Sequence, residues 1–234
     1  MSTELTKELL SFVNASPSAF HTVKNIEQML KTDGYTELKE SDAWKINPAG
    51  KYYVKRNDSS IIAFHVGENL ADYRFNIVAS HGDYPAFKVK EKSDIDVKGK
   101  YIQLNTEGYG GMICSTWFDR PLSVAGRVIV KNGNHLETRL INIDRDILII
   151  PSLAIHMNRQ VNDGVAYNKQ VDMVPLFGGS GMSKGDFDSM IANELGIDKD
   201  AIYGKDLYVY NRMEGRQWGE KQEFISAPHL DNTE

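Results

Sequence analysis

The spacing of apolar residues predicts that helices and strands alternate over the first third of the chain. One helical pattern places Leu5, Leu9, Leu10 and Val13 on a single face. A second begins near Ser16-Pro17 and ends at Asp33-Gly34. Apolar runs then predict three strands, at residues 52–56, 61–66 and 74–80. Helices followed by apolar strands predict an α/β layer fold.

The pattern changes near residue 88, after which short strands dominate. These strands are predicted at residues 87–91, 102–105, 127–131, 136–141 and 206–210. Asn132-Gly133 predicts a hairpin turn with positive φ at both residues, and Gly178-Gly179-Ser180-Gly181 predicts a flexible surface stretch. One helix is expected at residues 183–195, with Gly196 as its end.

The change in composition predicts three segments along the chain. Residues 1–88 form the first part of an α/β domain, residues 89–222 form an inserted β-rich domain, and residues 223–234 return to the first.

Composition and charge restrict the classes of function. The 234 residues carry a net charge of −5, without the basic excess of a nucleic-acid-binding protein. The single cysteine, Cys114, excludes an internal disulfide and fits a reducing compartment. The first residues lack the pattern of a secretory signal, and no apolar stretch approaches the ~20 residues of a membrane helix. A cytoplasmic protein without nucleic-acid or membrane partners is therefore expected.

Two short motifs carry candidate chemistry. His81-Gly82-Asp83 closes the apolar run at residues 74–80, so His81 is expected at the end of a buried strand, where open α/β sheets place their ligands. An imidazole can bind a cation while a nearby carboxylate fixes its tautomer. Asp231, in the second motif, is expected to follow another strand buried in the same sheet. Taken alone, the motifs leave open both a metal site and a structural cluster.

An ordered series of blocks between the two motifs is more specific. The series closely resembles the aspartyl aminopeptidase family of zinc metallopeptidases over almost the whole chain. Its blocks are residues 109–111 (Tyr-Gly-Gly), 115–122 (Ser-Thr-Trp-Phe-Asp-Arg-Pro-Leu), 125–128 (Ala-Gly-Arg-Val), 151–156 (Pro-Ser-Leu-Ala-Ile-His), 167–170 (Tyr-Asn-Lys-Gln) and 223–228 (Glu-Phe-Ile-Ser-Ala-Pro).

The resemblance implies an α/β fold, namely an incomplete zinc-peptidase-type α/β/α catalytic domain with an inserted β-rich dimerisation domain. It implies that His81 is a zinc ligand, that Asp83 orients His81, and that Asp231 bridges two zinc ions. A carboxylate suits a bridge because each of its oxygens can hold one cation. Within the dimerisation domain, His156 matches a histidine that reaches the neighbouring subunit's active site and helps to hold substrate. Family dimers assemble further into closed shells.

The implied activity is zinc-dependent removal of amino-terminal residues from peptides, with acidic residues preferred. In such a site the metals polarise the scissile carbonyl and activate water. The family's general base and its further ligands lie beyond the position of Asp231, so the chain is expected to be an incomplete peptidase that needs a carboxyl-terminal segment. The alternative is a catalytically inactive truncated remnant that serves as an oligomerisation or binding module, and a weaker one is an unrelated acidic binding protein.

Three positions depart from the family pattern. Gly82 and Tyr84 stand where the family usually has threonine and serine, and His229 stands where it usually has arginine. None of these departures removes a ligand, and His229 is a candidate for an additional metal contact because it lies two residues from Asp231.

Overall fold

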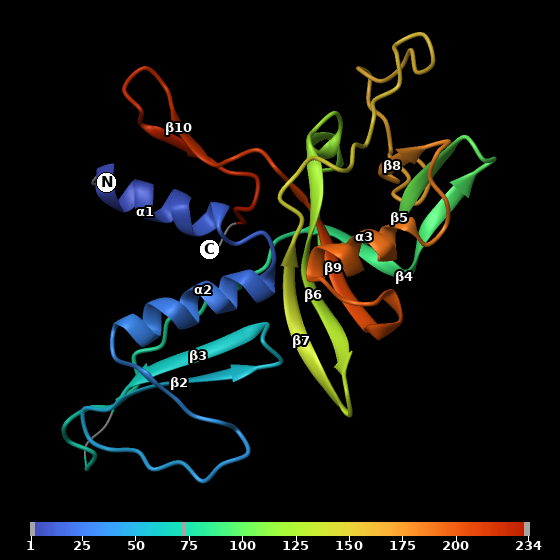
Figure 1. Ribbon diagram of the computed structural model, residues 1–234. Helices are drawn as coiled ribbons and strands as arrows, with labels where there is room; N and C mark the ends of the chain where they lie inside the picture. The colour runs from blue at the N-terminus through green and yellow to red at the C-terminus, as the bar shows by residue number, and fades with distance from the viewer. Residues whose placement is uncertain (1–2, 72–73, 232–234) are drawn as a thin grey trace. The chain divides into compact units, whose positions relative to one another are not determined.

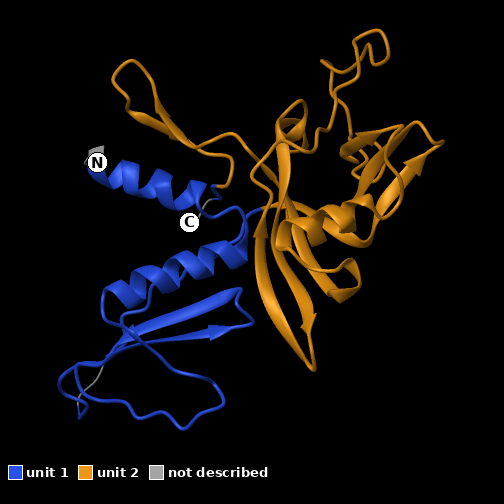
Figure 2. Cartoon of the chain, in the orientation of Figure 1, with its two compact units in different colours: residues 1–84, 230–234 blue, residues 85–229 orange. Residues whose placement is uncertain are grey.

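The computed structural model describes residues 3–71 and 74–231, and the chain divides into two compact units. Unit 1 comprises residues 1–84 and 230–234, and unit 2 comprises residues 85–229 (Figure 2). The sequence predicted the changes between segments after residues 88 and 222, whereas the chain leaves unit 1 after residue 84 and re-enters it after residue 229. The catalytic and dimerisation roles of the two segments remain predictions.

Unit 1 is built from two helices and a small sheet (Figure 1). Its elements are α1 (Thr3–Asn14), α2 (Ala19–Thr32), β1 (Thr36–Glu37), β2 (Lys51–Arg56) and β3 (Ser60–His65). Strand β2 is central, parallel to β1 and antiparallel to β3. Three consecutive residues of β2 are buried, Tyr52, Tyr53 and Val54, so both of its faces are covered. The core of unit 1 therefore follows this strand.

A charged cluster connects α2 to β2. The carboxylate of Glu27 on α2 accepts hydrogen bonds from Tyr53 Oη at 3.1 Å and from Lys55 Nζ at 2.9 Å. Lys31, one turn further along α2, lies 2.8 Å from the same carboxylate. Charge-assisted hydrogen bonds of this kind fix orientation, because donor and acceptor must both be placed to satisfy them.

The start of α2 differs slightly from the prediction. The helix begins at Ala19, and Ser18 is its N-cap residue with extended backbone angles. The sequence had placed the start near Ser16-Pro17, so Pro17 precedes the cap rather than occupying the first turn. The predicted end is confirmed, since the helix stops at Thr32 with Asp33 as its C-cap.

The strand predicted at residues 74–80 is wrong. These residues are outside every strand, and Phe75, Ile77 and Val78 are 78%, 82% and 98% exposed. A strand forms only when neighbouring strands satisfy its backbone donors and acceptors. Within residues 3–71 and 74–231, no strand pairs with this run. Residues 74–80 have the apolar pattern of a strand, but the pattern alone does not provide a neighbouring strand to pair with.

Unit 2 is organised around a six-stranded antiparallel sheet in the order β7-β6-β9-β4-β5-β8. The strands are β4 (Ala86–Val97), β5 (Tyr101–Tyr109), β6 (Leu122–Asn132), β7 (His135–Asn142), β8 (Leu176–Gly179) and β9 (Ile202–Asn211). The register of β4 on β5 shifts between Val89 and Asp94. The β4 segment between these residues is longer than the β5 segment opposite it, so the ladder is interrupted there.

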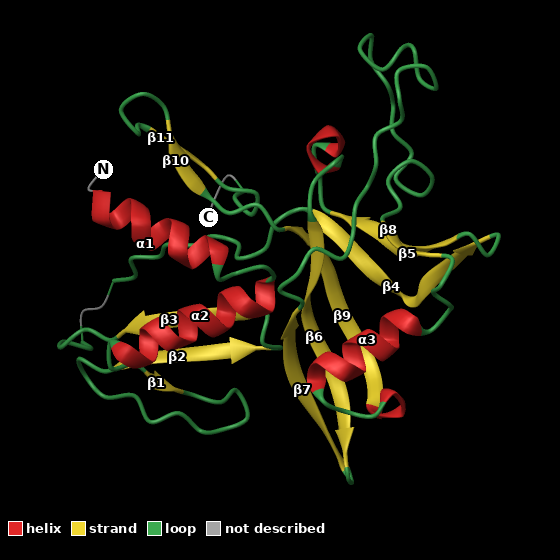
Figure 3. Cartoon of the chain, turned by 45° about the horizontal axis from the view of Figure 1, so that its top comes forward, coloured by secondary structure: helices red, strands yellow, loops and turns green. Residues whose placement is uncertain are grey.

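Helix α3 (Asp186–Leu195) packs on this sheet through its apolar face (Figure 3). Phe187 and Ile191 are fully buried, as the sequence predicted, and Gly196 is the C-cap residue. The ammonium of Lys205 on β9 is 2.5 Å from the carboxylate of Asp188, and the Lys205 side chain is only 2% exposed. This ion pair, buried at its lysine and partly exposed at its aspartate, joins the helix to the central part of the sheet.

The β6–β7 hairpin forms one residue later than the sequence indicated. Asn132 pairs with His135 and remains in the strand, so the two loop residues are Gly133 and Asn134. Gly133 has a φ of +59°, which is the conformation that glycine adopts without steric cost. The predicted hairpin is therefore confirmed, but its register is not.

Two further segments of unit 2 differ from expectation. Gly178 and Gly179 belong to β8 and pair with β5, so the stretch predicted as a flexible loop is partly sheet. Among the described residues, strands β10 (Arg216–Trp218) and β11 (Phe224–Ser226) pair only with each other. The buried strand expected just before Asp231 is therefore replaced by a small exposed hairpin that ends at Ser226. Short 3₁₀ turns, η1 (Cys114–Trp117) and η2 (Lys199–Ala201), complete the unit.

Among the residues that the structure describes, no helix combines the length and apolar composition that crossing a membrane requires.

Candidate metal site

The two motifs singled out in the sequence meet at one point of unit 1. His81 Nε2 lies 4.0 Å from Asp231 Oδ2, although the two residues are far apart along the chain. The side chains of His81, Asp83 and Asp231 are 37%, 39% and 33% exposed. Such half-exposed groups can be reached by a solute while the backbone still holds them in place.

The contact on the other ring nitrogen defines the tautomer of His81. Its Nδ1 is 2.7 Å from the backbone carbonyl oxygen of Asp83. A carbonyl oxygen can only accept, so Nδ1–H is the donor. In the neutral ring Nε2 then carries the lone pair, and Nε2 is the atom that faces Asp231. A histidine whose other nitrogen donates to a carbonyl is oriented as metal ligands usually are.

The part of Asp83 that orients His81 differs from the prediction. Its carboxylate Oδ1 lies 3.6 Å from Nδ1, beyond hydrogen-bond distance, whereas its main-chain oxygen makes the short contact. The carboxylate nevertheless lies beside the ring, where its negative charge favours a cationic neighbour.

His81 and Asp231 fit part of a zinc coordination shell. Zinc binds histidine nitrogen and carboxylate oxygen at about 2.0–2.2 Å, so a nitrogen–oxygen separation of 4.0 Å is close to the largest that one ion can bridge. A protein zinc site uses at least three such ligands. Within residues 3–71 and 74–231, no group of three or more His, Cys, Asp or Glu side chains is placed to hold a metal.

The other two sequence candidates lie in unit 2. His156 belongs to an exposed turn, and its expected role concerns a second subunit, so that role stays a prediction. His229 is buried, its Nε2 is 2.9 Å from the carbonyl oxygen of Asn211, and its ring packs edge-on against Tyr210. Because a carbonyl only accepts, Nε2–H is the donor. The structure thus gives Nε2 of His229 a hydrogen-bonding and packing role, and the additional metal contact expected of His229 stays a prediction.

The sequence did not predict that Tyr84 and Thr22 support the His81–Asp83 turn. Tyr84 Oη donates a hydrogen bond of 2.9 Å to the carbonyl oxygen of Pro17, and both residues are buried. Thr22, in the first turn of α2, packs against Gly82. The sequence signal for Tyr84 and Gly82 is their position beside the site residues.

His21, next to Thr22, is held in its neutral form. Burial, assisted by the nearby charge of Lys24, lowers the pKa of His21 from 6.5 to about 4. Its Nδ1 is 2.8 Å from Ser18 Oγ, so the ring also ties the helix start to its cap residue.

This pKa predicts a pH dependence of stability. In the unfolded chain His21 takes up a proton near pH 6.5, but in the folded chain only near pH 4, so protonation favours unfolding between these values. The free energy of unfolding should therefore be highest above pH 6.5 and fall as the pH is lowered toward 4. His21→Asn should flatten this slope in urea titrations across the window, whereas His135→Asn, at an exposed histidine, should leave it unchanged. An unchanged slope in His21→Asn would contradict the assignment.

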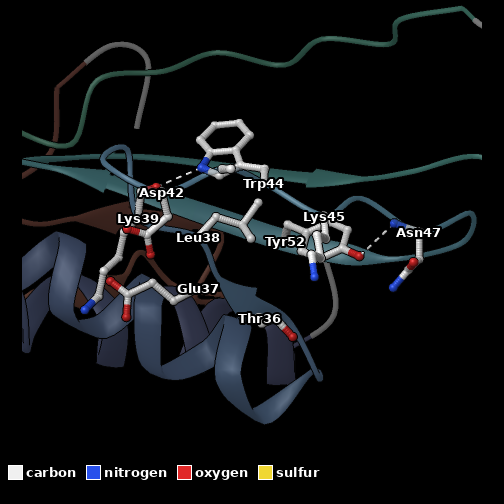
Figure 4. Close-up of a pocket in the computed structure, with 10 residues that line it drawn as sticks. Thr36, Glu37, Leu38, Lys39, Asp42, Trp44, Lys45, Asn47 and Tyr52 are labelled. Carbon is white, nitrogen blue, oxygen red and sulfur yellow. Dashed lines mark hydrogen bonds between the residues drawn. The ribbon is translucent and has the colours of Figure 1, made fainter.

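A pocket of about 490 Å³ lies elsewhere in unit 1 (Figure 4). Its lining comes from residues 36–47 and Tyr52 and includes none of the predicted site residues. Trp44 Nε1 donates to the carbonyl oxygen of Lys39 at 2.8 Å, and Tyr52 Oη accepts from the amide of Asn47 at 3.0 Å. These hydrogen bonds close the loop on itself, so we assign the pocket no catalytic role.

Histidine nitrogen and carboxylate oxygen are donor types that zinc-dependent hydrolases use to bind their metal. Comparison with known families is specific: the model of the aminopeptidase I zinc metalloprotease (M18) family matches residues 12–234. The chain therefore belongs to the M18 family.

Curated relatives agree with this assignment. A protein of Clostridium acetobutylicum named as a probable M18 family aminopeptidase 2 is 47% identical over 99% of the chain and 55% of its own length. A protein of Azotobacter vinelandii with the same name is 37% identical over 99% of the chain and 55% of its length. The chain thus spans about half the length of the curated relatives it matches.

Solved structures show the same fold. The cryo-EM structure of the Ape4 and Nbr1 complex matches with a TM-score of 0.87 and 35% identity, over 93% of this chain and 46% of that chain. The structure of Chaetomium thermophilum mApe1 matches with a TM-score of 0.84 and 33% identity, over 96% of this chain and 54% of that one. The fold is therefore that of the M18 aminopeptidases, with a mixed α/β unit and a β-rich unit, as the sequence predicted.

Proposed function

We propose that this chain carries part of the active site of a zinc-dependent aminopeptidase. The observation that carries the proposal is the approach of His81 Nε2 to the Asp231 carboxylate in a chain of the M18 family. Both atoms are of the kinds that bind zinc, and they come from the two motifs in which the resemblance places ligands.

Each site residue has a distinct part in this proposal. His81 offers the Nε2 lone pair to one ion, and Asp83 holds the ring in the required tautomer through its main-chain oxygen. Asp231 can bridge two ions, because its carboxylate has two oxygens. When bound, zinc polarises a peptide carbonyl as a Lewis acid and activates water as the nucleophile.

The proposal requires further groups from outside the described residues. His81 and Asp231 supply two ligands, and a proton acceptor for the attacking water is also needed. The curated relatives are nearly twice as long as this chain. We therefore propose that a carboxyl-terminal segment like theirs supplies the missing ligands and the general base.

Substrate and assembly follow from the resemblance and are proposed with it. The substrates are peptides with an acidic amino-terminal residue. Unit 2 serves as the dimerisation domain of a homo-oligomer, and its exposed His156 takes part in a neighbouring subunit's site. The protein acts in the cytoplasm.

One observation favours a second function. The described residues bring together only two candidate ligands, so the chain by itself has less than a zinc site needs. A catalytically inactive module that oligomerises through unit 2 would need no more than this.

Activity and assembly measurements separate the two proposals. The purified chain is incubated with zinc and with peptides beginning in Asp, Glu, Leu or Lys. Parallel reactions include a separately expressed polypeptide that covers the carboxyl-terminal part of the Clostridium acetobutylicum relative. Zinc-dependent release of Asp or Glu in the mixture supports the peptidase. Oligomers that neither bind zinc nor release amino acids under any of these conditions support the module and overturn the first proposal.

A further inference from the structure

We propose that Thr22 and Tyr84 are positioning residues that hold the His81-Gly82-Asp83 turn and, through it, the imidazole of His81. The role assigned to His81 rests on the proposed function, but the contacts that fix its ring do not. These contacts involve the start of α2 and the loop before it, which neither motif contains.

The carboxyl end of the turn is fixed by Tyr84. Its hydroxyl donates to the carbonyl oxygen of Pro17 at 2.9 Å, and both residues are buried. Breaking this hydrogen bond would leave a buried carbonyl without a donor, which costs free energy. The hydrogen bond therefore stays formed in the folded chain. Tyr84 follows Asp83 directly, so the bond limits the movement of the Asp83 carbonyl that holds His81 Nδ1.

The middle of the turn is fixed by Thr22. A Cβ atom added to Gly82 would lie 3.0 Å from Thr22 Cγ2, so glycine permits the observed close approach. Thr22 is itself constrained, because its hydroxyl donates to the carbonyl oxygen of Ser18 at 3.2 Å. The methyl group of a fixed side chain thus defines how closely the turn can approach α2.

The two contacts act on one hydrogen bond. The ring of His81 is oriented by the Asp83 carbonyl, and that carbonyl lies between Gly82, packed on Thr22, and Tyr84, bonded to Pro17. If either contact is lost, the carbonyl can rotate away from Nδ1. The preference for the tautomer with the proton on Nδ1 should then weaken. Gly82 and Tyr84 are also the two positions of the turn where this sequence departs from the family pattern.

Four variants test the proposal. Tyr84→Phe removes only the hydroxyl that reaches Pro17. Gly82→Ala adds the Cβ that presses on Thr22, and the double variant Gly82→Ala/Thr22→Ser removes the opposing methyl group while keeping the hydroxyl. Tyr53→Phe is the matched control, because it removes a tyrosine hydroxyl of the same unit that donates to Glu27 rather than to the segment before α2.

The readout is the tautomer of the neutral His81 ring, measured from its nitrogen chemical shifts in ¹⁵N-labelled chain without metal. We expect the ratio of Nδ1–H to Nε2–H forms to fall about fivefold in Tyr84→Phe and in Gly82→Ala, as for the loss of one hydrogen bond. The double variant should recover the original ratio, and Tyr53→Phe should keep it. Circular dichroism identifies any variant that fails to fold. The tautomer ratios of the variants that do fold then test the proposal.

Two results would overturn the proposal. One is an unchanged tautomer ratio in folded Tyr84→Phe and Gly82→Ala. The other is an equal change in Tyr53→Phe, which would show general loosening of unit 1. Zinc affinity, measured in parallel, reports on the proposed function separately. If the unaltered chain keeps the Nδ1–H tautomer but binds no zinc even with the carboxyl-terminal polypeptide of the relative, the positioning role stands and the metal role fails.

Discussion

Replacing His81 with alanine should abolish tight zinc binding by the chain supplied with the carboxyl-terminal polypeptide of the relative, because the change removes the imidazole whose Nε2 faces Asp231. Loss of an outer partner of a zinc ligand costs about 10- to 100-fold in affinity, so loss of the ligand itself should cost at least about 100-fold. Asp231→Asn keeps the shape of the side chain but removes its charge, and it should weaken binding in the same direction. Competition with a chromophoric chelator measures both effects.

The control for this prediction is His135→Ala, which removes an exposed histidine at the start of β7. Its zinc affinity should equal that of the unaltered chain. The titrations are made with the chain alone and with the carboxyl-terminal polypeptide of the relative, because a shell completed by further ligands makes the loss easier to measure. If His81→Ala binds zinc as tightly as the unaltered chain in both settings, His81 is not a ligand.

Replacing Gly126 with alanine should destabilise unit 2 more than most single substitutions. Gly126 lies in β6, between Leu207 of β9 and Ile141 of β7, and its φ is +155°. An added Cβ would overlap the carbonyl oxygen of Asp206 and lie 3.0 Å from Leu207 Cα. These are backbone atoms of a paired strand, so they cannot move without breaking the ladder. We expect the free energy of unfolding to fall by more than about 4 kcal/mol.

A second glycine of the same sheet provides the matched control. Gly204 lies on β9, and a Cβ added there would be 3.8 Å from Ile129 Cγ1, an ordinary contact distance. Gly204→Ala should therefore change the free energy of unfolding by no more than about 1 kcal/mol. Urea denaturation followed by circular dichroism measures both variants. Equal effects at the two positions would show that the close approach at Gly126 does not determine the stability of the sheet.

Sequence periodicity predicted the elements whose partners are close along the chain. Helix α2, the β2–β3 pair and the β6–β7 hairpin appear near their expected residues, because helical bonds and hairpin ladders are local. The turn register failed by one residue, since the preference of asparagine-glycine for a turn does not specify which residues leave the ladder. The strand predicted at residues 74–80 was wrong for a different reason. A strand there would need partners from distant parts of the chain, and the local apolar pattern does not specify such partners.

The candidate site was predictable only in part, because residue types can be identified from the sequence and contacts between distant segments cannot. The types and order of the residues around His81 and Asp231 indicated metal chemistry and the family, and the family is confirmed. Three-dimensional details were not encoded in the motifs. Examples are the main-chain oxygen of Asp83 as the orienting group, the packing of His229 against Tyr210, and the contacts of Thr22 and Tyr84. These depend on which segments fold against one another.

The sequence by itself determined the family, the α/β and β-rich character of the two segments, and the residues able to bind a metal. Composition and residue order are properties of the chain itself, so they can be known before it folds. Only the tertiary structure decided that His81 Nε2 faces Asp231, which nitrogen of His81 and of His229 donates to a carbonyl, and that residues 74–80 are exposed. Contacts between distant segments depend on packing and on the direction of each side chain, and no local pattern of residues specifies either.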